Sequence, residues 1–285
     1  MSVLLPPREL IEPEPELKFR RRVPLRTAAV ELWRARALLL TLAERDLRVR
    51  YKQAALGFAW AIVQPIVLLV AFTILFEHAA HINTHGVPYP LFSYLGLLPW
   101  TFFSETVSLG ANSIIGDKAL LNKVHFPREA FPLADTIVAL TDLSMASIAL
   151  LVLFGIERYL PRVTVYWVPV VIPIVLAFAI GVALVMSACM VYFRDVGQVL
   201  PIVLQIGLFA SPVAYSFSVI PVRFQALYAI VNPLGPVIDS LRRTVLMGLP
   251  PRPVPLVVAA LSASVYLVGG YKIFKRLELG FADVA

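Results

Sequence analysis

The chain has 285 residues, of which 59% are hydrophobic and 15% charged, and its formal net charge is +7. A soluble domain usually needs about 25% charged residues to cover its surface. This composition therefore excludes an ordinary soluble domain and predicts an all-α membrane protein with several spans. The single cysteine, Cys189, excludes an intrachain disulfide and a metal site built from several cysteines. The basic residues lie beside apolar spans, which is typical of cytoplasmic flanks and does not indicate nucleic-acid binding.

The chain begins with a Pro- and charge-rich stretch over residues 1–26, which we expect to be a cytosolic tail of unassigned role. Residues 27–55 are predicted to form an amphipathic helix in the headgroup layer. Its apolar positions recur at steps of three or four, at Val30, Trp33, Ala37, Leu40, Ala43 and Leu47. A surface helix packed on a partner domain is the alternative.

Six stretches are long and apolar enough to cross a bilayer, since about 20 such residues span its hydrocarbon core. They form a membrane domain over residues 56–275, before a cytosolic C-terminal tail over 276–285. The six predicted spans are 57–78, 91–113, 131–155, 167–192, 196–215 and 253–271.

Lysine and arginine are abundant before the first span and absent from the loop "HAAHINTHGVPYP" after it. This asymmetry predicts that both termini are cytosolic. The segment 216–248 then falls on the outer side, although it is apolar and contains Arg223, Arg242 and Arg243. We expect a re-entrant helical pair between spans five and six, because irregular backbone is tolerated in a membrane only under a cover of protein or water. A seventh span is the competing interpretation.

Polar residues occur inside two of the predicted spans. Thr101, Glu105, Ser108 and Asn112 are spaced to share one helical face, and so are Asp135 and Asp142. An ionisable group at that depth costs at least about 2.5–3.5 kcal/mol, so it should face protein or water. We favour structural hydrogen bonds for Ser108 and Asn112. For Glu105 and Asp142, a polar lining or proton relay and a structural bond remain equally open.

Enzymatic motifs are absent from the sequence. There is no G-x-x-x-x-G-K-[ST] phosphate loop and no H-E-x-x-H motif. His78, His81 and His85 have a spacing that would suit a metal on a helix, but Gly86 and Pro88 follow closely. We therefore interpret the histidines as an incidental cluster and expect no metal site.

Four stretches resemble the polysaccharide-exporting permeases of ATP-binding-cassette transporters, of the O-antigen and teichoic acid export type. The first, "RDLRVRYKQAALGFAWAIVQP", matches the family pattern R-Y-[KR] followed by LG-x-x-W-x-x-x-x-P, at Arg50, Tyr51, Lys52, Leu56, Gly57, Trp60 and Pro65. The others are "NKVHFPREAFPL", "YFRDVGQVLP", and the pair "SPVAYSFSVIP" and "NPLGPVIDSLRR", in the same order as in the family.

This resemblance implies a homodimeric permease in the bacterial inner membrane. It also implies two copies of a separate nucleotide-binding subunit that holds ATP with Mg²⁺, while this chain binds no cofactor. The substrate would be a lipid-linked polysaccharide such as a galactan, entering beside the amphipathic helix with its diphosphate near Arg48, Arg50 and Lys52. Channel-lining candidates are Phe72, Phe76, Trp100, Phe103, Glu105, Phe209 and Tyr215. ATPase-contact candidates are Asp117, Lys118, Lys123, Arg128, Arg194 and Asp195.

Three other functions remain as alternatives. A membrane glycosyltransferase or polymerase could use Glu105 or Asp142 as its base, but no acidic loop motif supports it. A proton-driven secondary transporter often has repeated halves, and no duplication is evident. A drug or lipid exporter with the same permease architecture is the third.

Overall fold

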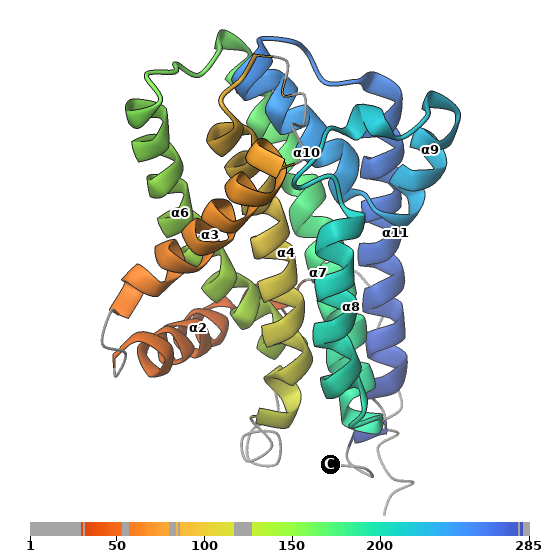
Figure 1. Ribbon diagram of the computed structural model, residues 1–285. Coiled ribbons are helices and arrows are strands. Elements are labelled where there is room, and N and C mark those ends of the chain that lie inside the picture. The colour runs from red at the N-terminus through yellow and green to blue at the C-terminus, as the bar shows by residue number, and fades with distance from the viewer. Residues whose placement is uncertain are drawn as a thin grey trace, which may run out of the picture.

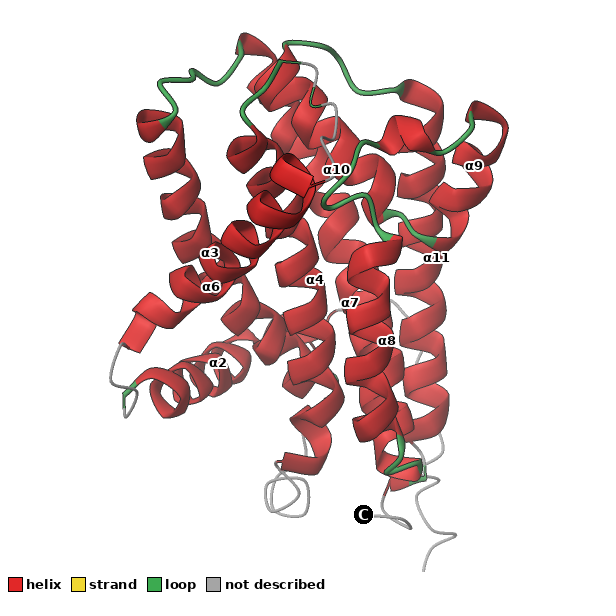
Figure 2. Cartoon of the chain, viewed as in Figure 1, coloured by secondary structure: helices red, strands yellow, loops and turns green. Residues whose placement is uncertain are grey.

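The computed structural model describes residues 30, 32–52, 57–79, 84, 86–116, 127–278 and 280–281. Within these residues the protein is helical and has no strand, which confirms the all-α prediction (Figures 1 and 2). The α-helices are α2 (Arg36–Tyr51), α3 (Trp60–Phe72), α4 (Tyr89–Gly116), α6 (Ala130–Ile156), α7 (Val168–Tyr192), α8 (Val196–Ala210), α9 (Val222–Val231), α10 (Leu234–Arg242) and α11 (Pro253–Glu278). Short 3-10 or π-helical turns are η1 (Gly57–Ala59), η2 (Thr73–Ala79), η3 (Val163–Trp167), η4 (Phe217–Val219) and η5 (Arg243–Met247).

The long helices run up and down between two ends of the bundle (Figure 1). We call one the α2 end, which carries α2, the turn at 193–195 between α7 and α8, and the last turn of α11. The opposite, or α10, end carries the loop 157–162, α9, α10 and the loop 248–252. Helix α2 lies crosswise to the long helices, and α3 is slanted beside α4.

Four segments of the described chain are long and apolar enough to cross a membrane. They are Gly57–Phe76, Ala130–Ile156, Val163–Tyr192 and Pro253–Glu278. Helix α4 has 28 residues but is less apolar, and it is buried along most of its first half. Helix α8 has 15 residues, and α9 and α10 have 10 and 9. The chain is therefore a multi-pass membrane protein.

The core forms where α4 and α7 meet α6, α10 and α11. Helices α7 and α11 approach closely because glycines face each other across their contact. A Cβ at Gly181 would lie 2.5 Å from the backbone of Tyr266. On the other side of α7, a Cβ at Gly110 of α4 would lie 3.0 Å from the Cβ of Ala183. Small residues of this kind let membrane helices pack backbone to backbone.

Arg242, at the end of α10, is only 2% exposed and joins three parts of the α10 end. Its guanidinium donates to four backbone carbonyls, those of Phe92, Pro212, Val213 and Tyr215. The guanidinium carbon also lies 3.6 Å from the centre of the Phe92 ring. A buried arginine is tolerated when its N–H groups find acceptors in this way. Arg242 therefore ties the loop after α8 to α4.

Helix α2 is held on the first turns of α6. Leu42 and Ala43 are buried against Ala130, Phe131 and Ala134. By contrast, the apolar side chains of Leu40 and Val49 on α2 are 57% and 74% exposed, and those of Val30 and Trp33, which precede α2, are 50% and 70% exposed. One side of the helix therefore packs on the bundle, while another presents apolar groups outward.

Candidate functional site

A cavity of about 420 Å³ opens on the side of the bundle, between α3 and α8 and beside the end of α2. Its walls come from α2, α3, α4, α6 and α8. The polar and aromatic side chains that line it are Arg50, Trp60, Gln64, Trp100, Thr101, Phe102, Ser104, Glu105, Ser108, Asp142 and Gln205. The cavity thus combines indole rings, amides and one group of charges.

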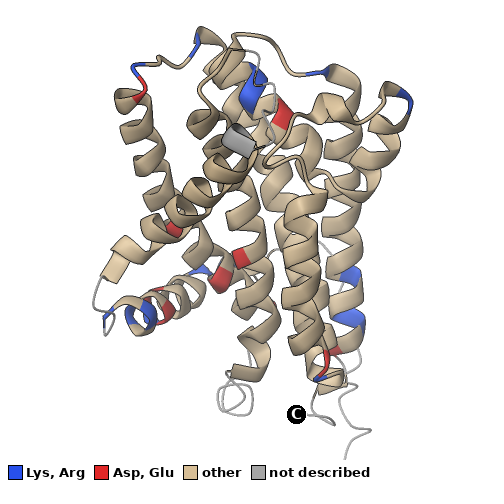
Figure 3. Cartoon of the chain, viewed as in Figure 1, with Lys and Arg blue, Asp and Glu red and all other residues tan. Residues whose placement is uncertain are grey.

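The charges form a compact cluster between α2, α4 and α6. Arg50 forms an ion pair with Glu105 through Nη2, and its Nη1 lies 3.0 Å from Oδ2 of Asp142. The hydroxyl of Tyr51 donates a hydrogen bond to Oδ1 of Asp142. Figure 3 shows acidic residues on the long helices at the level of α2, beside the charged residues of α2 itself. One guanidinium therefore bridges two carboxylates from different helices.

Burial explains why the cluster is assembled in this way. The side chain of Asp142 is 5% exposed and that of Glu105 21%. A carboxylate so far from water is unfavourable without a counter-charge or a donor. Arg50 and Tyr51 supply both from the last turn of α2, which the apolar contact with α6 holds in place.

The environment keeps the α2 side of this cluster protonated. Burial alone would lower the pKa of Arg50, but the nearby carboxylates of Glu105 and Asp142 outweigh it and raise that pKa above its usual value. Burial, followed by the hydrogen bond to Asp142, raises the pKa of the Tyr51 phenol well above its usual range. Arg50 is therefore a permanent cation, and Tyr51 a permanent donor, near neutral pH.

The aromatic wall of the cavity is positioned by close packing. Trp100 on α4 is buried, and a Cβ at Gly207 of α8 would lie 2.7 Å from its ring. Trp60, at the start of α3, is half exposed on the other side of the opening. Because Pro65 has no N–H, the carbonyl of Ala61 in the cavity wall lacks its usual helical donor. Indole faces with amides suit a ligand that carries both apolar faces and hydroxyl groups.

The structure separates the three basic residues predicted for substrate entry. Arg50 points into the cavity, whereas Lys52 is exposed and Arg48 is exposed in an ion pair with Glu44. Arg48 and Lys52 are thus accessible cations at the end of α2, whereas Arg50 is paired with the carboxylates of Glu105 and Asp142.

The channel-lining candidates fall into four places. Trp100 and Glu105 line the cavity together. Phe72 contacts Phe76 and Phe209 at ring-centre distances of 5.5 and 6.3 Å, in a group between α3 and α8. Phe103 also touches Trp100, at 5.7 Å, but stacks at 4.8 Å on Phe178 inside the bundle. Tyr215 lies at the α10 end, where its hydroxyl donates to the carbonyl of Ala210.

The candidates for ATPase contact lie at the α2 end or outside the described residues. Arg194 and Asp195 are exposed in the turn between α7 and α8. Arg128 donates to the carbonyl of Glu278 at 3.1 Å, beside a buried ion pair between Lys275 and Glu129 at 2.6 Å. Asp117, Lys118 and Lys123 lie outside the described residues, as does most of the histidine cluster. Within the described chain no group of three acidic, histidine or cysteine residues is placed to hold a metal.

Several lining residues were not singled out from the sequence. Gln64 lies on α3 and Gln205 on α8. Their positions on these helices would indicate a cavity only if the neighbouring helices were already known. Trp60 is visible in the sequence only as a motif letter. The same is true of Tyr51, which does not line the cavity but bonds to Asp142, 91 positions away.

With this geometry in view, comparison with known proteins decides the family. A model of the family described as ABC-2 type transporter matches residues 37–246. The chain belongs to the ABC-2 type transporter family. The matched region of this ABC-2 type transporter contains every residue that lines the cavity, and the resemblance to export permeases is confirmed.

Named relatives cover nearly the whole of this ABC-2 type transporter. The O-antigen export system permease protein RfbA of Myxococcus xanthus is 30% identical over 254 residues, which are 89% of this chain and 97% of that protein. A protein of the same name from Klebsiella pneumoniae is 24% identical over 252 residues, 87% and 94% of the two chains. The polysialic acid transport protein KpsM of Escherichia coli is 24% identical over 240 residues, 82% and 91% of the two chains.

Proposed function

We propose that this ABC-2 type transporter is the permease subunit of an ATP-driven exporter of a lipid-linked polysaccharide. It would move the glycan from the cytosolic to the outer face of the bacterial inner membrane. The observation that carries the proposal is the cavity between α3 and α8, because its indoles and amides suit sugar rings, in a chain whose relatives are named as glycan export permeases. The sequence has no phosphate loop, so ATP and Mg²⁺ would bind to a separate subunit.

In this proposal six segments cross the membrane: the four apolar ones, α4 and α8. Helix α8 is about 22 Å long at 1.5 Å per residue, shorter than the roughly 30 Å hydrocarbon core. The loop after α8, with α9 and α10, would complete the crossing and return to the outer side as a re-entrant pair. The α2 end would then be cytosolic, with both termini on that side and α2 in the headgroup layer.

A second copy of the chain would cover part of the outward apolar surface. In Gly57–Phe76 only 17% of the most apolar stretch is buried, compared with 44% in Val163–Tyr192. Helix α8, on the other side of the cavity, also exposes Val199, Ile202 and Ile206. A homodimer that joined these faces would close the cavity into a channel. The group of Phe72, Phe76 and Phe209 lies between the same two helices and would line it too.

Two copies of an ATPase subunit would bind at the α2 end. The exposed turn at Arg194 and Asp195 is the contact that the described structure supports. Asp117, Lys118, Lys123 and Arg128 remain further candidates. The diphosphate of the substrate would contact Arg48 and Lys52 first, since these cations are accessible. It would contact Arg50 only after the ion pair of Arg50 with Glu105 or Asp142 is broken.

The test is to deplete the protein in its host and measure lipid-linked glycans retained in the inner leaflet, with rescue by variants. We expect full-length polymer to accumulate, and rescue by Gln205→Leu to be weaker than rescue by the matched control Gln198→Leu. Gln198 lies on the same helix and does not line the cavity. Loss of polymer with accumulation of short precursors would instead identify a glycosyltransferase or polymerase. No change in any glycan would favour a drug or lipid exporter.

A further inference from the structure

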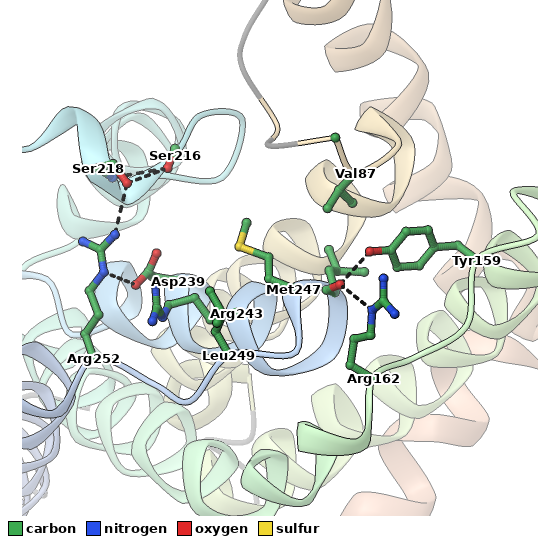
Figure 4. Close-up of a pocket in the computed structure, with 12 residues that line it drawn as sticks. Val87, Tyr159, Arg162, Ser216, Ser218, Asp239, Arg243, Met247, Leu249 and Arg252 are labelled. Carbon is green, nitrogen blue, oxygen red and sulfur yellow. Dashed lines mark hydrogen bonds and ion pairs between the residues drawn. The ribbon is translucent and has the colours of Figure 1, made fainter.

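A second cavity, of about 480 Å³, lies at the α10 end of the bundle, whereas the first lies beside the end of α2. Figure 4 shows the side chains that line the second cavity. Its walls come from residues 86–87, the loop 159–162, the loop 216–218 and the segment 239–252. Three arginines line it, namely Arg162, Arg243 and Arg252. We call it the arginine pocket.

The charges of the pocket are unbalanced. Its described lining contains the three arginines and one carboxylate, that of Asp239, which leaves two positive charges in excess. Arg252 is held in place by the protein, since its Nε lies 3.4 Å from Asp239 and its Nη2 donates to Ser218 at 3.1 Å. Arg252 is therefore paired with Asp239, whereas Arg162 and Arg243 form no ion pair within the described part of the chain.

Arg162 and Arg243 each use one N–H to anchor the side chain and leave the others available. The Nε of Arg243 donates to the carbonyl of Pro250 at 2.9 Å. The Nε of Arg162 lies 3.5 Å from the carbonyl of Leu246. Within the described part of the chain, no acceptor contacts Nη1 or Nη2 of either residue. Two anchored guanidiniums with free ends thus border the same cavity.

The rest of the lining suits a ligand with an anionic group and an apolar portion. Val87, Leu246, Met247 and Leu249 form apolar wall, and Figure 4 shows Met247 between Arg162 and Arg252. Guanidinium groups bind phosphate oxygens through paired N–H donors. Arginines are also unfavoured on the outer side of a membrane protein, where the proposed topology places this end. We propose that the arginine pocket binds the phosphate group of a membrane-associated phosphodiester or diphosphate.

Two sources would supply this chemistry. One is the diphosphate of the lipid-linked substrate as it arrives in the outer leaflet, and this choice rests on the proposed function. The other is the headgroup of an anionic phospholipid. The phosphate site itself depends on neither.

The experiment uses the full chain in nanodiscs of phosphatidylcholine and measures binding of inorganic pyrophosphate by calorimetry at low salt. We expect saturable binding, weakened roughly tenfold or more by the double change Arg162→Gln and Arg243→Gln. The paired change of both residues to Lys should lose less, because it keeps the charge and loses only the fork of donors. Arg223→Gln is the matched control, since Arg223 is exposed at the same end but lies outside the pocket.

Absence of saturable binding, or an equal loss in the Arg223→Gln control, would overturn the proposal. Nanodiscs containing phosphatidylglycerol separate the two sources. Weaker pyrophosphate binding there would assign the pocket to a phospholipid headgroup, whereas unchanged binding would assign it to the diphosphate of the substrate. Neither arm requires ATP hydrolysis or glycan export, so failure of the proposed function would leave this result unaffected.

Discussion

Gly270 of α11 lies directly against Gly181 of α7, so closely that a Cβ at position 270 would be 2.2 Å from the carbonyl oxygen of Gly181. That oxygen is backbone and cannot rotate away. The close contact between α7 and α11 therefore requires glycine, which has no Cβ, at both positions.

Gly270→Ala should accordingly separate α7 from α11. We expect the free energy of unfolding to fall by about 1–3 kcal/mol, the usual effect of overpacking. The measurement is the melting temperature of the detergent-solubilised protein, which should be lower. Gly269→Ala is the matched control, because a Cβ there meets nothing within 4 Å. Equal melting temperatures for the two variants would contradict the packing described here.

Gly96→Ala tests the site of the buried arginine. A Cβ at Gly96 would lie 2.5 Å from Nη2 of Arg242 and 2.9 Å from the carbonyl of Val213. We expect the arginine to be displaced from its carbonyl acceptors, with destabilisation of a few kcal/mol because the guanidinium stays buried. Thermal unfolding and protease sensitivity of the loop after α8 measure the effect. Gly116→Ala, on the same helix with nothing near its Cβ, should leave both unchanged.

Arg50→Gln and Arg48→Gln should differ sharply, although both remove one positive charge from α2. Removal of Arg50 leaves two carboxylates without their cation, which we expect to cost about 3–5 kcal/mol and to release α2 from the bundle. Arg48 forms an exposed pair with Glu44, so its loss should change stability by less than about 1 kcal/mol. Limited proteolysis of α2 reports the difference. Restored protection in the triple variant Arg50→Gln, Glu105→Gln, Asp142→Asn would identify charge balance as the cause, and equal cleavage of Arg48→Gln and Arg50→Gln would refute it.

Tyr51→Phe addresses the proton balance of the cluster. The raised pKa of Tyr51 means that its hydrogen bond to Asp142 contributes fully below about pH 10, the usual phenol value, and is lost only as the pH rises further. We therefore expect a destabilisation of about 1 kcal/mol, to which titration of the phenol itself adds no pH dependence from about pH 6 to 9. Melting temperatures of both proteins across this range test it. A difference that varied with pH would show that another group of the cluster exchanges a proton, as the proton-relay alternative requires.

The helical period of the sequence was enough to predict one wall of the cavity. Thr101, Glu105 and Ser108 were expected on a common face of the second span, and all three line the cavity. Asn112 continues the same spacing, but its side chain is exposed and donates to the carbonyl of Ser108. Spacing gives the direction of a side chain, not where the cavity ends.

The sequence could not indicate which helices are neighbours. Arg50 and Asp142 were assigned to separate roles, because nothing local to either residue shows that α2 packs on α6. The arginine pocket was hidden for the same reason, since its lining comes from four separated segments. Arg242 and Arg243 stand out in the sequence as arginines among apolar residues. Arg242 is a buried structural anchor, whereas Arg243 lines the arginine pocket.

The ion cluster also implies an order of events while the chain is being synthesised. Asp142 follows Tyr51 by 91 positions, so at about 5–20 residues per second it leaves the ribosome roughly 5–18 s after the end of α2. During that interval Arg50 lacks the carboxylate of Asp142, and α2 lacks the α6 surface on which Leu42 and Ala43 pack. The cluster is therefore completed, and α2 docks on the bundle, only after α6 has been synthesised. A nascent chain stalled before α6 should carry α2 undocked.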